Sequence, residues 1–177
     1  MLKFFLATGV GAFALFLWGA MTLVLIPWHD QVLLEVADEA AVLDTLQEVA
    51  PAGGVYSVPV VHEDYTATSP FAVIAWRPGG FGMGQGTVML ASLLGYWLAA
   101  IVVGWLLSWT RNLSYGQRVL FVAGLGAFAS LAVHFQNWVW TGYSVGYTAM
   151  ATVDVMVGWL LAGLILAWFI PDQKVRS

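Results

Sequence analysis

One carboxylate inside an apolar stretch is the residue of this sequence best suited to chemistry. Asp154 lies in the long hydrophobic run near the C-terminus, and His134 lies in the run before it. A carboxylate at membrane depth is costly unless it is protonated, hydrated or paired, and a histidine changes charge near neutral pH. These residue types suit a proton relay, an ion site or a pocket for a polar headgroup or a quinone ring.

The residues around His134 recur at helical spacing. They form one polar stripe of Ser130, His134, Asn137 and Thr141, and Gly126 extends it inward. This spacing predicts that their side chains share one face of a helix.

Asp154 is predicted to face this stripe. It shares a helix face with Gly158 and Ala162, and small residues allow close helix packing. The short connection over residues 140–148 makes the two helices antiparallel neighbours. We therefore expect one buried polar cluster, with His29 as a cap just outside the first apolar run. Its members are Ser130, His134, Asn137 and Asp154.

Three interpretations of this cluster remain open. It is a functional relay or binding site, a hydrogen-bonded brace between two helices, or a site where water simply hydrates Asp154. Two histidines and one aspartate suit zinc or copper in principle, but nothing in their spacing selects a metal. We therefore predict no metal site, no cofactor and no catalytic residues.

Two further motifs carry less information. The glycine-rich segment over residues 79–84 lacks the Lys and Ser or Thr of a phosphate-binding loop, so we interpret it as a hinge. His62, Glu63 and Asp64 are adjacent in the chain, and adjacent residues rarely converge on one metal without distant partners. We expect an acidic, solvated turn there.

The composition identifies the class of protein that holds these residues. Of the 177 residues, 60% are hydrophobic and only 9% are charged, and the mean hydropathy is +0.82. A soluble domain carries about 25% charged residues, and a nucleic-acid binder needs a basic face. The composition thus excludes soluble enzymes, disordered tails and nucleic-acid binders. The absence of cysteine excludes disulfides and thiolate chemistry.

We expect an all-α membrane protein built on a four-helix transmembrane bundle. A helix needs about 20 residues to cross a hydrocarbon core of about 30 Å. Four runs meet this length: residues 4–26, 87–109, 119–139 and 149–170. The first run is longer than a signal-peptide core and lacks a cleavage site, so we expect a retained anchor.

The basic residues predict the orientation. Five of the six fall on the side that holds both termini, and Arg77 is the exception: Lys3, Arg111, Arg118, Lys174 and Arg176. The positive-inside rule places that side in the cytoplasm of a bacterial inner membrane. Eight of the ten acidic residues lie in residues 28–86, which are expected outside.

The chain therefore divides into a first transmembrane helix (1–27), an extracytoplasmic segment (28–86), and three further helices with a short cytoplasmic tail (87–177). Within the middle segment, the pattern predicts a β-α-β-β order. The expected strands are 32–36, 55–61 and 71–76, and the expected helix is 38–50. A small α+β cap on the membrane domain and a mobile loop are both consistent with this segment.

Short motifs support a loose family resemblance. They close the first run, follow the predicted outer helix and lead into the fourth run: Pro27-Trp28-His29, Gly53-Gly54-Val55-Tyr56-Ser57-Val58-Pro59, Pro70-Phe71-Ala72-Val73 and Trp140-Thr141-Gly142-Tyr143. In this layout the chain resembles a group of small four-span bacterial inner-membrane proteins of unassigned function. The resemblance implies no catalytic residues.

Three functions are compatible with these features. We expect a non-enzymatic accessory or scaffold subunit that packs in the bilayer against a larger membrane complex, for example a bioenergetic one. Its partners would be membrane lipids and other membrane-protein subunits or further copies of itself, and not nucleic acid. The alternative is a small oligomeric transporter or proton-coupled binding protein that uses His134 and Asp154. The third is a membrane enzyme acting on a lipid or a quinone.

Overall fold

Four long apolar helices form the bulk of the computed structural model, which describes residues 1–60, 68–110 and 112–170. Each is long and apolar enough to cross a membrane: α1 (Leu2–Val24), α3 (Gln85–Ser108), the segment Tyr115–Thr141 and α6 (Val145–Phe169). The third segment has three parts: α4 (Tyr115–Ser130), a π-helical turn η1 (Leu131–Phe135) and α5 (Gln136–Thr141). The four predicted spans are confirmed, and each begins two to four residues earlier than expected.

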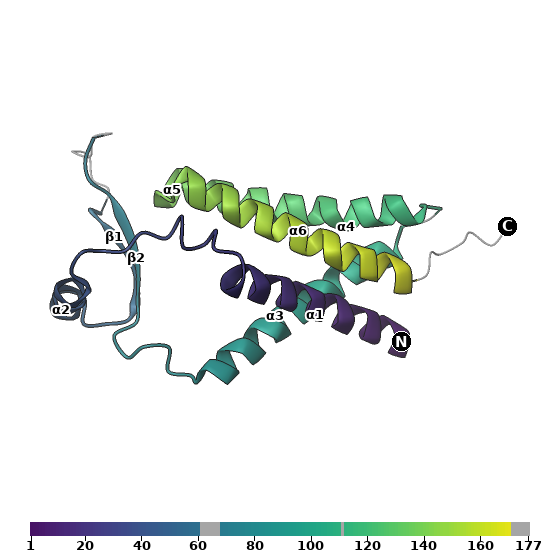
Figure 1. Ribbon diagram of the computed structural model, residues 1–177, viewed down its shortest axis with the longest axis horizontal. Coiled ribbons are helices and arrows are strands. Elements are labelled where there is room, and N and C mark those ends of the chain that lie inside the picture. The colour runs from purple at the N-terminus through teal and green to yellow at the C-terminus, as the bar shows by residue number, and fades with distance from the viewer. Residues whose placement is uncertain (61–67, 111, 171–177) are drawn as a thin grey trace.

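Consecutive spans run antiparallel, so the N-terminus and the end of α6 lie at the same end of the bundle (Figure 1). We call this the terminal end and the opposite one the distal end. α6 packs between α4 and α1, and α3 packs mainly against α1. The spans thus form a row in the order α4, α6, α1, α3.

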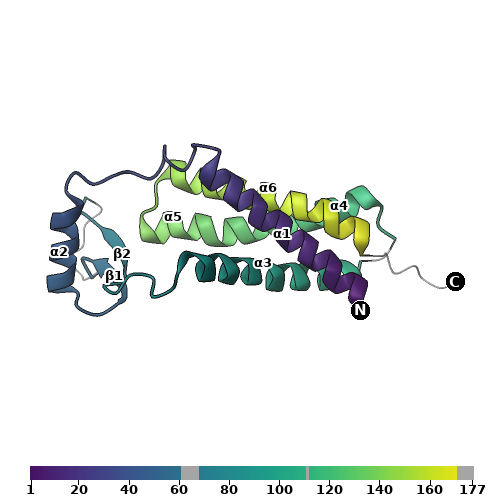
Figure 2. The same ribbon diagram turned by 60° about the horizontal axis from the view of Figure 1, so that its bottom comes forward.

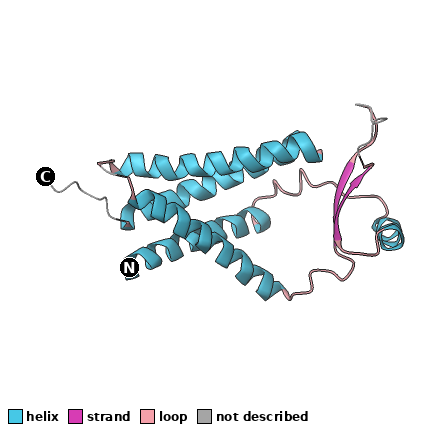
Figure 3. Ribbon diagram, turned by 180° about the vertical axis from the view of Figure 1, so that it is seen from behind, coloured by secondary structure: helices cyan, strands magenta, loops and turns pink. Residues whose placement is uncertain are grey.

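All four spans pack against one another only at the terminal end. There all four spans contribute to one buried core: Ala7, Val103, Leu107, Val122, Leu166 and Ile170. The buried residues of α3 all lie in its second half, from Ala100 to Leu107. Its first half diverges from α1 toward the distal end, as Figures 1 and 3 show.

Arg118 joins α4 to the end of α6. Its side chain is only 5% exposed, and its guanidinium donates to the backbone carbonyls of Ala167 (3.0 Å) and Ile170. The last carbonyls of a helix have no partner inside it, and the helix dipole favours a cation there. Arg118 was expected in a loop, but the Ser114 capping box starts α4 early enough to include it.

The segment between the first two spans holds a helix and a hairpin beyond the distal end (Figure 2). α2 (Glu39–Val49) is capped by Asp38, and β1 (Gly54–Val58) pairs antiparallel with β2 (Ala72–Trp76). The Trp76 indole donates to the carbonyl of Ala50 and ties the hairpin to α2. The expected helix and second and third strands are confirmed.

The expected first strand, over residues 32–36, is wrong. These residues form a turn and an irregular linker. A strand needs a partner for its backbone groups, and β1 and β2 pair with each other in a two-stranded sheet. Val32 instead lies against Gly146 at the start of α6. His62, Glu63 and Asp64 lie outside the described residues, as does the tail after Ile170.

Close packing of α4 against α6 depends on glycine. A Cβ atom on Gly126 would lie 2.4 Å from the Cβ of Trp159, and one on Gly163 would lie 3.2 Å from the Val119 carbonyl. Gly124, on the same helix, has no neighbour within 4 Å of the same position. Gly126 therefore sets the distance between the two helices.

We expect Gly126→Ala to lower the free energy of unfolding by about 1–3 kcal/mol, the usual cost of overpacking. The Trp159 Cβ is attached to the backbone, so it cannot swing away from the added methyl. Gly124→Ala is the matched control, because it adds the same methyl to open space. Thermal unfolding in detergent, followed by circular dichroism, should show a lower midpoint for Gly126→Ala alone. Equal midpoints would contradict the close approach.

Candidate functional site

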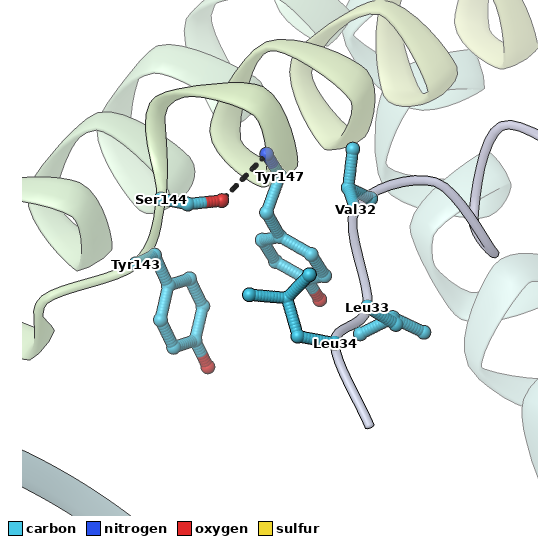
Figure 4. Close-up of a pocket in the computed structure, with 6 residues that line it drawn as sticks. All are labelled: Val32, Leu33, Leu34, Tyr143, Ser144 and Tyr147. Carbon is cyan, nitrogen blue, oxygen red and sulfur yellow. Dashed lines mark hydrogen bonds between the residues drawn. The ribbon is translucent and has the colours of Figure 1, made fainter. Parts of the chain in front are cut away.

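Asp154 lies near the middle of its helix. It is nine residues after Val145, or roughly 13–14 Å along the axis at 1.5 Å per residue. The predicted run over residues 149–170 would place it only five residues from the start of the span. The difference arises because α6 begins at its N-cap residue Ser144, whose hydroxyl accepts from the Tyr147 amide (Figure 4).

Asp154 lines a small cavity between α1, α3 and α6, which we call the Asp154 cavity. Its volume is about 50 Å³, enough for one or two water molecules at about 30 Å³ each. The carboxylate shares the wall with a phenol and two indoles: Tyr96, Trp18 and Trp159. An acidic oxygen in a cavity lined by aromatic side chains is suited to a small cationic or hydrogen-bond-donating group.

No described residue neutralises the carboxylate. Its Oδ1 atom is buried and accepts no hydrogen bond from the described residues. The Trp18 indole donates at 3.0 Å to the backbone carbonyl of Asp154, so it holds the helix and not the acid. Leu15 and Trp18 pack where a side chain on Gly158 would lie. Asp154 and Gly158 therefore face α1.

A wider groove adjoins this cavity, between the distal halves of α1 and α3. We call it the α1/α3 groove. It has a volume of about 390 Å³ and mostly apolar walls, which include Leu23, Val88 and Met89. Gly19 and Tyr96 line both the groove and the Asp154 cavity. The carboxylate thus lies beside an opening on the side of the bundle.

The polar stripe of the third span meets the other side of α6. Ser130 is buried and donates to the carbonyl of Thr152. Residues in a helix are about 100° apart, so Thr152 and Asp154 point to nearly opposite sides of α6. Among the described residues, no hydrogen bond or ion pair joins His134 to Asp154. The structure therefore separates the expected cluster into two groups.

His134 lies in the π-helical turn η1. Its Nδ1 atom is buried without a hydrogen-bond partner in the part of the chain that is described, and so is the Thr148 hydroxyl of α6. Asn137 is half-buried and accepts from Thr141 through its backbone carbonyl. This group has unsatisfied polar atoms but no acid.

His29 closes the end of α1. Its Nδ1 atom lies 2.9 Å from the carbonyl oxygen of Thr22, which has no partner further along the helix. The Trp28 ring contacts both the His29 ring and the Trp18 ring, with centroids 6.1 and 6.4 Å apart. His29 is thus connected to the Asp154 cavity through two tryptophans.

Ala162, which was predicted to share a helix face with Asp154 and Gly158, is fully buried.

Three aromatic residues of this site were not predicted from the sequence, namely Trp18, Tyr96 and Trp159. Tyr96 and Trp18 each lie four residues from a hydroxyl residue in their own span, Ser92 before Tyr96 and Thr22 after Trp18. That spacing is the signal that could have found them. Across residues 1–60, 68–110 and 112–170, no three His, Asp or Glu residues lie close enough to hold a metal ion.

The distal end has an open pocket of about 380 Å³ between the linker after α1 and the start of α6 (Figure 4). Val32, Leu33 and Leu34 line one side, and the Tyr143 and Tyr147 rings, 5.0 Å apart, line the other. Its lining contains no acid, histidine or basic residue. We interpret this pocket as part of the contact surface between the linker after α1 and the helix bundle.

These features define a four-span α-helical membrane protein with one carboxylate inside its spans and a small helix-and-hairpin segment between the first two. Family models, curated proteins and solved structures were all compared with the chain, and none matches it.

We expect Trp18→Phe to lower the free energy of unfolding by about 1 kcal/mol more than Trp28→Phe. Both changes remove the same volume, but only Trp18 donates a hydrogen bond, whereas the buried Trp28 Nε1 has no described partner. Losing a made bond costs about 1 kcal/mol, and removing an unpaired donor relieves a penalty. Chemical denaturation in detergent measures both. The reverse order would contradict the link between α1 and α6.

Proposed function

We propose that this chain is an accessory or scaffold subunit of a larger membrane assembly in a bacterial inner membrane. The supporting observation is the unpartnered distal half of α3. From Gln85 to Gly95, only Val88 and Leu93 are even half-buried, and all the other residues are exposed. A span that leaves its own bundle offers a face to another protein.

The chemistry of that face favours a protein over lipid. Ala91 and Gly95 are four residues apart, and Gly95 has nothing within 4 Å of its Cβ position. Small residues at this spacing let a second helix approach closely. Ser92 and Tyr96 add hydroxyl groups beside them, and such groups find hydrogen-bond partners on another helix more readily than in hydrocarbon.

The outer segment has a second unpartnered surface. α2 buries none of its residues, and its apolar side chains Val42 and Val49 are 43% and 69% exposed. A helix with an apolar face normally packs that face against something. The exposed faces of α3, within the membrane, and of α2, outside it, together support binding of another protein.

The orientation follows from the charges. We place the terminal end in the cytoplasm, because Lys3 and Arg118 lie there and the basic residues near 111 and 174–176 flank the same ends of the spans. The acidic segment with α2 and the hairpin then lies outside.

We expect the tagged protein, extracted in mild detergent, to run as a particle that contains at least one other membrane protein in fixed stoichiometry. Native mass spectrometry gives the mass and composition of that particle against the 19.2 kDa of this chain. Gly95→Trp should release the partner, because it fills the small-residue face of α3. Gly124→Trp, at an equally open position on α4, is the control. A particle of this chain and lipid alone would refute the proposal.

A second candidate is supported by two buried, unpartnered polar atoms, His134 Nδ1 and Asp154 Oδ1. In this candidate the chain is an oligomeric, proton-coupled transporter or binding protein. The two groups lie on opposite sides of α6, so they would act together only between copies. It predicts that the purified chain in vesicles shows a pH-driven proton flux, which Asp154→Asn and His134→Ala each abolish. If the proton flux persists in Asp154→Asn, the carboxylate takes no part in proton transport.

A further inference from the structure

Among the described residues, the Asp154 carboxylate has no counter-charge. The basic residues within the described spans are Lys3 in α1 and Arg118 in α4, and both lie at the terminal end, where Arg118 already caps α6. Asp154 lies near the middle of its helix, and Arg77 lies in the outer segment. An ionisable group at membrane depth normally has a specific partner or marks a functional site.

The Asp154 cavity has the size and chemistry for one small cation. About 50 Å³ is enough for an ammonium group, which is close to water in size. The carboxylate and the Tyr96 hydroxyl are acceptors, and the indoles of Trp18 and Trp159 line the same cavity, where aromatic rings favour a cation. The site therefore fits a primary ammonium group.

We propose that this cavity receives the ammonium group of a lysine carried by a transmembrane helix of a different protein, seated in the α1/α3 groove. The inference rests on the proposed role as a subunit and names the chemistry of the partner. A second copy of this chain does not supply the group, because Lys3 is the second residue of α1 and Lys174 comes after the end of α6 in the sequence, so neither lies near the middle of a span.

The route from the groove matches a lysine side chain. The groove walls Leu23, Val88 and Met89 are apolar and suit the four-carbon stem. Gly19 and Tyr96 border both spaces, so the stem passes between them to the carboxylate. The depth of Asp154 favours a cation delivered by a helix over one on a lipid headgroup, which belongs at the membrane surface.

The test is photo-crosslinking in native membranes. A photoreactive amino acid replaces Met89 in the groove and, as a matched control, Phe128 on the exposed face of α4. Mass spectrometry identifies the attached peptide. We expect Met89 to capture an apolar span that contains a lysine, and Asp154→Asn to lower the yield about thirtyfold or more, as when a buried charge pair loses one partner. Asp154→Glu, which keeps the charge, should retain most of the yield.

A charge exchange keeps the test decisive if Asp154→Asn folds poorly. Asp154→Lys in this chain should abolish the crosslink, and replacing the partner's lysine with aspartate should restore it. A captured span without a lysine, or a yield unaffected by Asp154→Asn, overturns the lysine proposal and leaves the subunit role intact. Capture of lipid alone at Met89, together with a particle of this chain only, overturns both.

Discussion

The close approach of α4 to α6 determines where the other helices lie. Gly126 meets the Cβ of Trp159, Ser130 reaches the carbonyl of Thr152, and Arg118 holds the end of α6. One face of α6 is therefore occupied along most of its length. The remaining face, with Asp154 and Gly158, packs on α1, and α1 in turn carries α3. The open row of helices follows from this filling of one side of α6.

That arrangement also decides the environment of the charge. Placing a carboxylate at the centre of a membrane helix costs about 2.5–3.5 kcal/mol or more. On the α4 side, the same group would be enclosed by Trp159 and the close backbones. On the α1 side, it borders a cavity that adjoins the α1/α3 groove, so a compensating group can enter from outside the chain. Asp154 therefore lies beside the α1/α3 groove, the one place among the described spans where two neighbouring helices do not pack along their full length.

The sequence predicted the spans because their apolar runs are continuous, and the α4–α6 adjacency because their connection is short. It predicted that Asp154 faces the polar stripe of the third span, whereas Ser130 reaches the carbonyl of Thr152, because spacing alone does not distinguish the two faces of α6. The prediction of a single polar stripe also assumed that the third span is a regular α-helix. The turn Leu131–Phe135 closes its hydrogen bonds over five residues instead of four, which changes the directions of His134 and Asn137. Helix starts were placed late because the N-caps Ser114 and Ser144 were not used, although both can be identified in the sequence.

The Arg118 cap has a consequence for assembly. A chain is made from its N-terminus, so this guanidinium exists before Ala167 and Ile170, whose carbonyls it binds. Sliding α6 by one residue would move those carbonyls by about 1.5 Å and turn them by about 100°. The hydrogen bonds can form only when the last helix has reached its correct depth. The two hydrogen bonds of Arg118 therefore form only when α6 has its correct register, and only after the rest of the bundle has been synthesised.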